Sequence, residues 1–164
     1  MCNRLQSEVF VDANIFVYHF SGPTEYSDSC ARLLQRIEDA KLVGFTSTLV
    51  LAEALHRLMI IEATTTLHLA PKMVLRHLKA HPSLVKQLPQ HLTVPDSIQA
   101  IGITILPLNV DDVLNSNAIK KEYGLLTNDA LNLAIMRHHH LNNIATNDPD
   151  FAGVPGLTVW KPPT

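Results

Sequence analysis

Short apolar runs alternate with segments of helical periodicity along most of this chain. Strand-like runs are expected at 8–11, 42–45, 101–106, 143–145 and 157–160, and helices at about 27–40, 49–61, 110–123 and 128–139. This alternation predicts an α/β architecture built on a mainly parallel sheet. In such a sheet, functional residues gather at the carboxyl ends of the strands, where the next helices begin.

Residues at the predicted helix ends support this assignment. Ser27 is expected to cap the helix at 27–40, and residues 46–48 offer side-chain oxygens to the segment 49–61. Gly124 is expected to end the helix at 110–123. The segment 49–61 is apolar nearly all round, which predicts a buried helix.

The composition is that of one folded domain. Hydrophobic residues make up 46% of the 164-residue chain and charged residues 17%, which excludes intrinsic disorder and predicts a single domain over residues 1–164. The net charge of -2 gives no overall attraction to nucleic acid, so a nucleic-acid surface would have to be a local patch.

The cysteine content and the lengths of the apolar runs further limit the class of protein. Two cysteines, Cys2 and Cys30, are too few for a disulfide framework or a thiolate metal site. No apolar run reaches the roughly 20 residues that a membrane span needs. These features predict a cytoplasmic protein with no membrane contact.

The stretch from 63 to 95 differs from the rest, because it contains four prolines and no clear strand. It is expected to be a helical insertion or arm. No acidic residue lies between Glu62 and Asp96, whereas Lys72, Arg76 and Lys79 lie there. These cations are either RNA-binding residues that contact phosphates beside the acidic centre or a solvated helix face, and both readings stay open. Apolar residues of the arm are expected to serve as core or as a dimer contact.

Four acidic residues, Asp12, Glu53, Asp129 and Asp148, stand at the ends of predicted strands or in the first turns of predicted helices. Because parallel strands share one carboxyl edge, we expect these carboxylates to lie together. An acid at such a boundary is also a common helix cap, and this explanation stays open, above all for Asp129. Apolar neighbours around Glu53 predict that it is buried. Clustered acids need a cation, and oxygen ligands alone favour Mg²⁺ or Mn²⁺.

Four motifs, in this order, resemble those of a known family. They are Val11-Asp12-Ala13-Asn14, the segment 49–55 around Glu53, Asn128-Asp129-Ala130, and the segment 144–151 with Thr-Asn-Asp at 146–148. With these motifs the sequence resembles the PIN-domain nucleases, in particular the VapC-like toxins of prokaryotic toxin–antitoxin pairs. The resemblance implies a PIN-like three-layer α/β/α domain with a central, mainly parallel sheet and a helical arm at 63–95.

The same resemblance implies a metal-dependent endoribonuclease that acts as the toxin of such a pair. Its catalytic residues would be Asp12, Glu53, Asp129 and Asp148. These four acids and Asp150 would be the ligands of Mg²⁺ or Mn²⁺, supported by Asn14 and Thr146. Its partners would be an RNA substrate, an antitoxin protein and a second copy of the chain in a homodimer.

Two other functions are weighed against this one. A non-catalytic PIN module that binds RNA or a protein partner would be expected to have lost one or more of the acids, and all four are present. A phosphatase with an aspartyl nucleophile would need an Asp-x-Asp motif, but position 14 is Asn.

The pair Asp148 and Asp150 calls for separate roles. Pro149 pushes the backbone of Asp148 toward extended geometry, which continues the strand before it. Asp148 is therefore assigned to the metal, and Asp150 is expected to cap the turn or helix that starts at Phe151.

Overall fold

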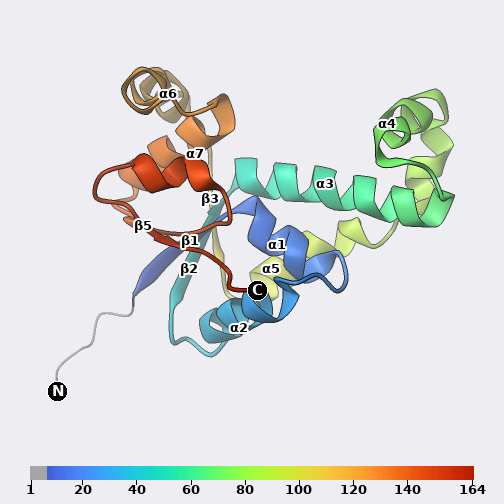
Figure 1. The fold of residues 1–164 in the computed structure, drawn as a ribbon, viewed down its shortest axis with the longest axis horizontal. Coiled ribbons are helices and arrows are strands. Elements are labelled where there is room, and N and C mark those ends of the chain that lie inside the picture. Colours follow the sequence, from blue (N-terminus) through green and yellow to red (C-terminus); the bar gives the residue numbers. More distant parts are fainter. Residues whose placement is uncertain (1–6) are drawn as a thin grey trace.

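The computed structural model describes residues 7–164, so Cys2 lies outside the described residues. Within this range the strands form one five-stranded sheet in the order β3-β2-β1-β4-β5, and every neighbouring pair is parallel (Figure 1). The strands are β1 (Glu8–Val11), β2 (Val43–Ser47), β3 (Thr104–Leu106), β4 (Asn143–Ala145) and β5 (Thr158–Trp160). The predicted α/β architecture with a parallel sheet is confirmed.

Helices cover both faces of the sheet. Figure 1 shows α6 and α7 on one side and α1 and α2 on the other, which makes the three layers expected for the fold. The α-helices are α1 (Ala13–Phe20), α2 (Ser27–Glu38), α3 (Thr48–Leu67), α4 (Pro71–Ala80), α5 (Val94–Ala100), α6 (Val110–Tyr123) and α7 (Thr127–His138). Short 3₁₀ helices are η1 (Pro82–Gln87), η2 (His91–Thr93) and η3 (Pro149–Gly153).

Helix α1 is not among the predicted helices. It is only 8 residues long and is made largely of aromatic and β-branched residues, whose intrinsic helix propensity is low. Burial stabilises it instead, because Ile15 and Phe16 are fully buried against the β1 residues Phe10 and Val11 in the main core. Its first turn starts directly after Asp12, which places that acid at the junction of β1 and α1.

Gly44 lets α2 approach the sheet closely. A Cβ atom at this position of β2 would lie 2.8 Å from Ile37 Cγ2 of α2, closer than side chains pack. The residue has no side chain because the helix fills that space.

Helix α3 is not the fully buried helix that its composition predicts. Its buried residues are Val50, Ala54, Leu58, Glu62 and Ala63, a single stripe at helical spacing. Most of the other apolar side chains of the helix are partly exposed. The helix is apolar nearly all round because different parts of it pack against the sheet, α1 and the arm.

The structure also decides the predicted caps. Ser47 caps α3 as expected, since its hydroxyl oxygen accepts the Val50 N–H at 3.0 Å, and Gly124 ends α6 with φ of 70°. The expected cap by Ser27 is wrong. Its hydroxyl donates to the carbonyl oxygens of Tyr18 and Gly22, so it ties α2 to the end of α1.

The arm consists of α4, η1 and η2 and has a small core of its own. Val74, Leu78 and Leu88 pack against Ala63 of α3. Since about 15 Å of helix separates residue 63 from residue 53, the arm lies at the end of α3 far from the sheet (Figure 1). None of the helices in residues 7–164 has both the length and the apolar character needed to cross a membrane.

Candidate metal centre

Asp12 stands at the centre of the carboxyl edge of the sheet. Its N–H donates to the Ala145 carbonyl of β4 at 3.0 Å. Continued past the last paired residues, the registers of β1 place Ser47 on one side of Asp12 and Thr146 on the other. A hydroxyl residue therefore lies at each neighbouring strand end.

The carboxylate of Asp12 is held by three donors. Its Oδ1 accepts the Ala13 N–H at 2.7 Å, while its Oδ2 accepts the Asn14 amide at 2.7 Å and the Thr146 hydroxyl at 2.6 Å. Asn14 also accepts the N–H of Asn147 at 3.0 Å, and the Thr146 hydroxyl accepts that of Asp148 at 3.0 Å. The two residues expected to support the site thus connect Asp12 to the loop that follows β4.

Burial raises the pKa of Asp12. Hydrogen bonds from Thr146 and Ala13 act in the opposite direction, and the negative charges of Glu53 and Asp148 add to the increase. Burial and nearby negative charges disfavour the ionised form of this acid. A cation bound beside it would stabilise the ionised carboxylate and so lower its pKa.

The carboxylates of Asp129, Asp148 and Asp150 lie closest together. One oxygen of each lies within 4.8 Å of an oxygen of the other two. Burial, followed by the charges of Asp148, Asp12, Asp150 and Glu53, raises the pKa of Asp129 to about 6. Five acids from distant parts of the chain therefore share one electrostatic environment.

The roles expected for the pair Asp148 and Asp150 need a correction. The 3₁₀ helix η3 begins at Pro149, and its cap is Asp148, whose Oδ1 accepts the Asp150 N–H at 2.9 Å. Proline is favoured at the first position of a helix, so the helix starts at Pro149 and not at Phe151. The cap is therefore Asp148 and not Asp150. The extended backbone expected for Asp148 is confirmed by its φ of -76° and ψ of 124°.

Glu53 reaches the cluster from α3, but it is not buried as expected. Its side chain is 32% exposed and pairs with Arg57 at 3.6 Å, and the Asn128 amide donates to it at 3.4 Å. The buried acid of α3 is Glu62, which belongs to the buried stripe of the helix, whereas Glu53 lies beside that stripe. Apolar neighbours in sequence do not bury a helical residue, because they point in other directions.

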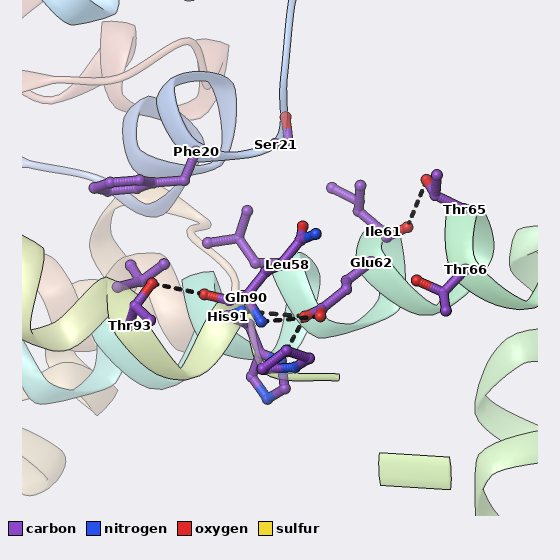
Figure 2. Close-up of a pocket in the computed structure, with 12 residues that line it drawn as sticks. Phe20, Ser21, Leu58, Ile61, Glu62, Thr65, Thr66, Gln90, His91 and Thr93 are labelled. Atoms are coloured by element: carbon purple, nitrogen blue, oxygen red, sulfur yellow. Dashed lines mark hydrogen bonds and ion pairs between the residues drawn. The ribbon is translucent and has the colours of Figure 1, made fainter. Parts of the chain in front are cut away.

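Glu62 joins the arm to α3 at the floor of a cavity of about 530 Å³ (Figure 2). It accepts hydrogen bonds from the N–H groups of Gln90 and His91 and is 2.9 Å from His91 Nδ1. Burial alone would raise the pKa of Glu62, but these hydrogen bonds together outweigh it and hold the pKa below its usual value. Because both carboxylate oxygens of Glu62 are hydrogen-bonded in this way, Glu62 has a structural role and holds the arm against α3.

The three arm cations lie apart from the acidic cluster. Lys72, Arg76 and Lys79 are exposed and share one face of α4, opposite Val74 and Leu78, which pack on α3. The arm is not beside the acidic centre as expected, because α3 continues past the predicted end of its helix and carries the arm outward.

Two hydrogen-bonded pairs of polar residues near the cluster, Ser47 with Asn132 and Asn147 with Tyr18, are not predicted as site residues by the sequence motifs. Asn132 accepts a hydrogen bond from Ser47 at 3.1 Å, and the Asn147 amide donates to Tyr18 at 3.1 Å. The sequence indicates Ser47 only as a cap. Asn132 lies three residues after Asp129 and is surrounded by apolar residues in the sequence. This isolated polar residue is the sequence signal that could have identified the buried Ser47–Asn132 pair.

The residues present fit a hard divalent cation. Mg²⁺ and Mn²⁺ take oxygen ligands, and the cluster offers carboxylate oxygens from Asp129, Asp148 and Asp150, with Asp12 and Glu53 close enough to affect Asp129 electrostatically. The donor set contains no thiolate or imidazole, the ligands that zinc prefers.

Comparison with known proteins gives a family match and related sequences. The family model described as PIN domain matches residues 9–157. The chain is 32% identical to Ribonuclease VapC2 of Methanocaldococcus jannaschii over 156 residues, which cover 94% of this chain and 93% of that protein. It is 24% identical to Ribonuclease VapC6 of the same organism over 163 residues, covering 94% of this chain and 97% of that protein.

Solved structures share the fold. VapBC2 from Rickettsia felis, bound to a DNA fragment from its promoter, aligns with a TM-score of 0.61 at 17% identity, covering 94% of this chain and 98% of that one. A toxin–antitoxin complex from Klebsiella pneumoniae aligns with a TM-score of 0.60 at 22% identity, covering 94% of this chain and 97% of that one.

Proposed function

The chain belongs to the PIN-domain family, and we propose that it is a Mg²⁺- or Mn²⁺-dependent endoribonuclease of the VapC type, the toxin of a toxin–antitoxin pair. The observation that carries the proposal is the convergence of five acids at the carboxyl edge of the sheet. Within this group, oxygens of Asp129, Asp148 and Asp150 lie within 4.8 Å of one another. Family membership and the related ribonucleases support the reaction class, and the donor set supports the metal.

Asp129, Asp148, Asp150, Asp12 and Glu53 would hold the metal. When bound, a divalent cation supplies charge neutralisation at the scissile phosphate and lowers the pKa of an attacking water. Asn14 and Thr146 orient the carboxylate of Asp12 by hydrogen bonds of 2.7 and 2.6 Å. Burial and the neighbouring carboxylates raise the pKa of Asp129 to about 6 in the metal-free protein, so a bound cation would favour its ionised form. One carboxylate of the cluster would help to orient or deprotonate the attacking water.

The substrate and the protein partners extend the same proposal. RNA is the proposed substrate, because both related proteins are named ribonucleases, and an antitoxin is the proposed partner, because solved structures with this fold include a toxin–antitoxin complex. The proposed location is the cytoplasm, where the protein would meet an RNA substrate.

A homodimer is proposed through the outer face of α6. Val110, Val113 and Leu114 lie on this face with exposures of 74%, 44% and 63%, and Leu126, 72% exposed, precedes α7. Large apolar side chains gathered on one surface favour burial against a second protein surface. This α6 face is opposite Asp112, Ser116 and Ile119, which pack inward.

A Mn²⁺ titration tests the proposed function. The protein is stripped of metal with EDTA, and its melting temperature and its cleavage of a single-stranded RNA are followed as Mn²⁺ is added. Mn²⁺ is expected to raise the melting temperature and to activate cleavage. Asp129→Asn should abolish cleavage yet leave the metal-free fold intact or slightly stabilised, because it relieves repulsion among the acids.

Asp28→Asn, at an exposed position of α2, is the matched control and should behave like the parent protein. Full cleavage by the Asp129→Asn variant would overturn the site assignment. Mn²⁺ binding without cleavage of any RNA would favour the non-catalytic module instead.

A further inference from the structure

We propose that Ser47 and Asn132 form a positioning pair that fixes the two helices carrying Glu53 and Asp129 relative to each other and to Asp12. The inference rests on the proposed function, because these acids belong to the proposed metal site. The Ser47 hydroxyl donates to Asn132 Oδ1 at 3.1 Å. Both residues are buried, with exposures of 0% and 1%.

Ser47 occupies a strand end next to Asp12, as Thr146 does on the other side. Thr146 bonds to Asp12 and to the N–H of Asp148, and so ties the β4–η3 loop to the central acid. Ser47 has the corresponding position on β2. Its oxygen caps α3 by accepting the Val50 N–H, and its proton goes to Asn132 of α7.

Each helix joined by the pair carries one acid of the cluster. Glu53 lies in the second turn of α3, six residues after Ser47, and Asp129 lies one turn before Asn132 on the same side of α7. Two buried polar side chains stabilise this junction only while they pair with each other, so the hydrogen bond specifies how the helices meet.

This geometry matters because the acids repel one another. One oxygen each of Asp129, Asp148 and Asp150 lies within 4.8 Å of the others, and repulsion between these carboxylates tends to displace α7. The other side-chain link from α7 to Glu53, through Asn128, is exposed and longer at 3.4 Å. The Ser47–Asn132 pair is the buried link that keeps the carboxylates in place before a cation is bound.

The test measures Mn²⁺ affinity by titration calorimetry without RNA, together with the melting temperature of the metal-free protein. Asn132→Leu removes the amide while it keeps the branching of the side chain, and it leaves the α3 cap intact. Ser47→Gly removes the hydroxyl at a position where glycine is tolerated as a cap. Each variant is expected to weaken Mn²⁺ binding about tenfold, as loss of a group that orients metal ligands does.

The double variant should bind Mn²⁺ no more weakly than either single one, because the two residues act as one unit. Ser47→Thr keeps the hydroxyl and is expected to bind Mn²⁺ within about twofold of the parent. Ser29→Ala is the matched control, since it removes a buried hydroxyl of α2 that donates to the backbone carbonyl of Tyr26. It should lower the melting temperature without changing the Mn²⁺ affinity.

Unchanged Mn²⁺ affinity in both Asn132→Leu and Ser47→Gly, with the parent binding normally, would overturn the inference and leave the proposed function standing. A parent protein that binds no Mn²⁺ would overturn the proposed function and the inference with it. If Asn132→Leu fails to fold, the Mn²⁺ affinities of Ser47→Gly and Ser47→Thr test the inference in the same way.

Discussion

Asp129 carries a pKa of about 6 because it is desolvated and surrounded by other carboxylates. In an unfolded chain its pKa is 3.8, so between pH 3.8 and about 6 the folded state binds more protons than the unfolded state. The contribution of Asp129 to the free energy of unfolding of the metal-free protein should therefore fall as pH rises through this window. Asp12, whose pKa burial also raises, adds to the trend.

Urea unfolding in EDTA at several pH values between 4 and 8 measures this trend. Asp129→Asn should flatten the decline relative to the parent, whereas Asp28→Asn on α2 should not. A parent protein whose stability rises steadily across this range, with Asp129→Asn following the same curve, would show that Asp129 is not destabilised by its neighbours.

Asp148 and Asp150 are expected to contribute unequally to metal binding. Asp148 is partly buried and its backbone N–H is bonded to Thr146, while Asp150 is exposed. We expect Asp148→Asn to raise the Mn²⁺ concentration needed for cleavage far more than Asp150→Asn. The opposite order in a Mn²⁺ titration of the two variants would reverse the assignment.

Measurements of protein stability distinguish the capping role of Asp148 from its proposed role as a metal ligand. Asn at 148 still offers an oxygen to the Asp150 N–H, so the melting temperature should be retained. Asp148→Ala loses the cap and should cost about 1 kcal/mol of the free energy of unfolding, measured by urea titration.

At the level of elements, the arm presents its three cations on one face of α4, away from the acidic cluster. If Lys72, Arg76 and Lys79 bind phosphates of a long RNA, replacing all three with Ala should weaken RNA binding. The slope of log affinity against log salt should become shallower by about one unit for each phosphate that the variant no longer binds. Cleavage of a short RNA that reaches only the acidic cluster should be unchanged.

A second triple variant separates specific phosphate binding from net charge. Arg32→Ala, Arg36→Ala and Lys41→Ala remove the same charge from α2 and the turn after it, and should leave the salt slope nearly as in the parent. An equal change in both triple variants would identify the basic face of α4 as ordinary solvated surface.

At the level of the whole molecule, the proposed homodimer would form through the α6 face. Val110→Lys with Leu114→Lys places two charges in the proposed interface, where burying them unpaired is costly. Sedimentation velocity should show a dimer for the parent and a monomer for the variant. Met73→Lys with Leu75→Lys, exposed apolar positions on α4, should remain dimeric. A parent that is monomeric at all concentrations would contradict the proposed homodimer.

Several features were readable from the chain because they depend on neighbours in sequence. The five strands, the helices α2, α3, α6 and α7, the Ser47 cap, the Gly124 stop and the extended backbone before Pro149 are local properties, and the structure confirms them. The resemblance to PIN-domain nucleases is likewise confirmed, and its motifs are short segments at strand ends or in the first turns of helices.

Tertiary structure decided the rest. Glu53 is partly exposed and Glu62 buried because the arm and α1 pack on one stripe of α3, which no local pattern defines. Helix α1 forms despite low propensity because the core buries it, and the Lys72 face lies far from the acids because α3 extends outward. The sequence by itself determined which side chains could bind a metal. Packing between distant segments determined which of them meet, because burial and charge repulsion act through space.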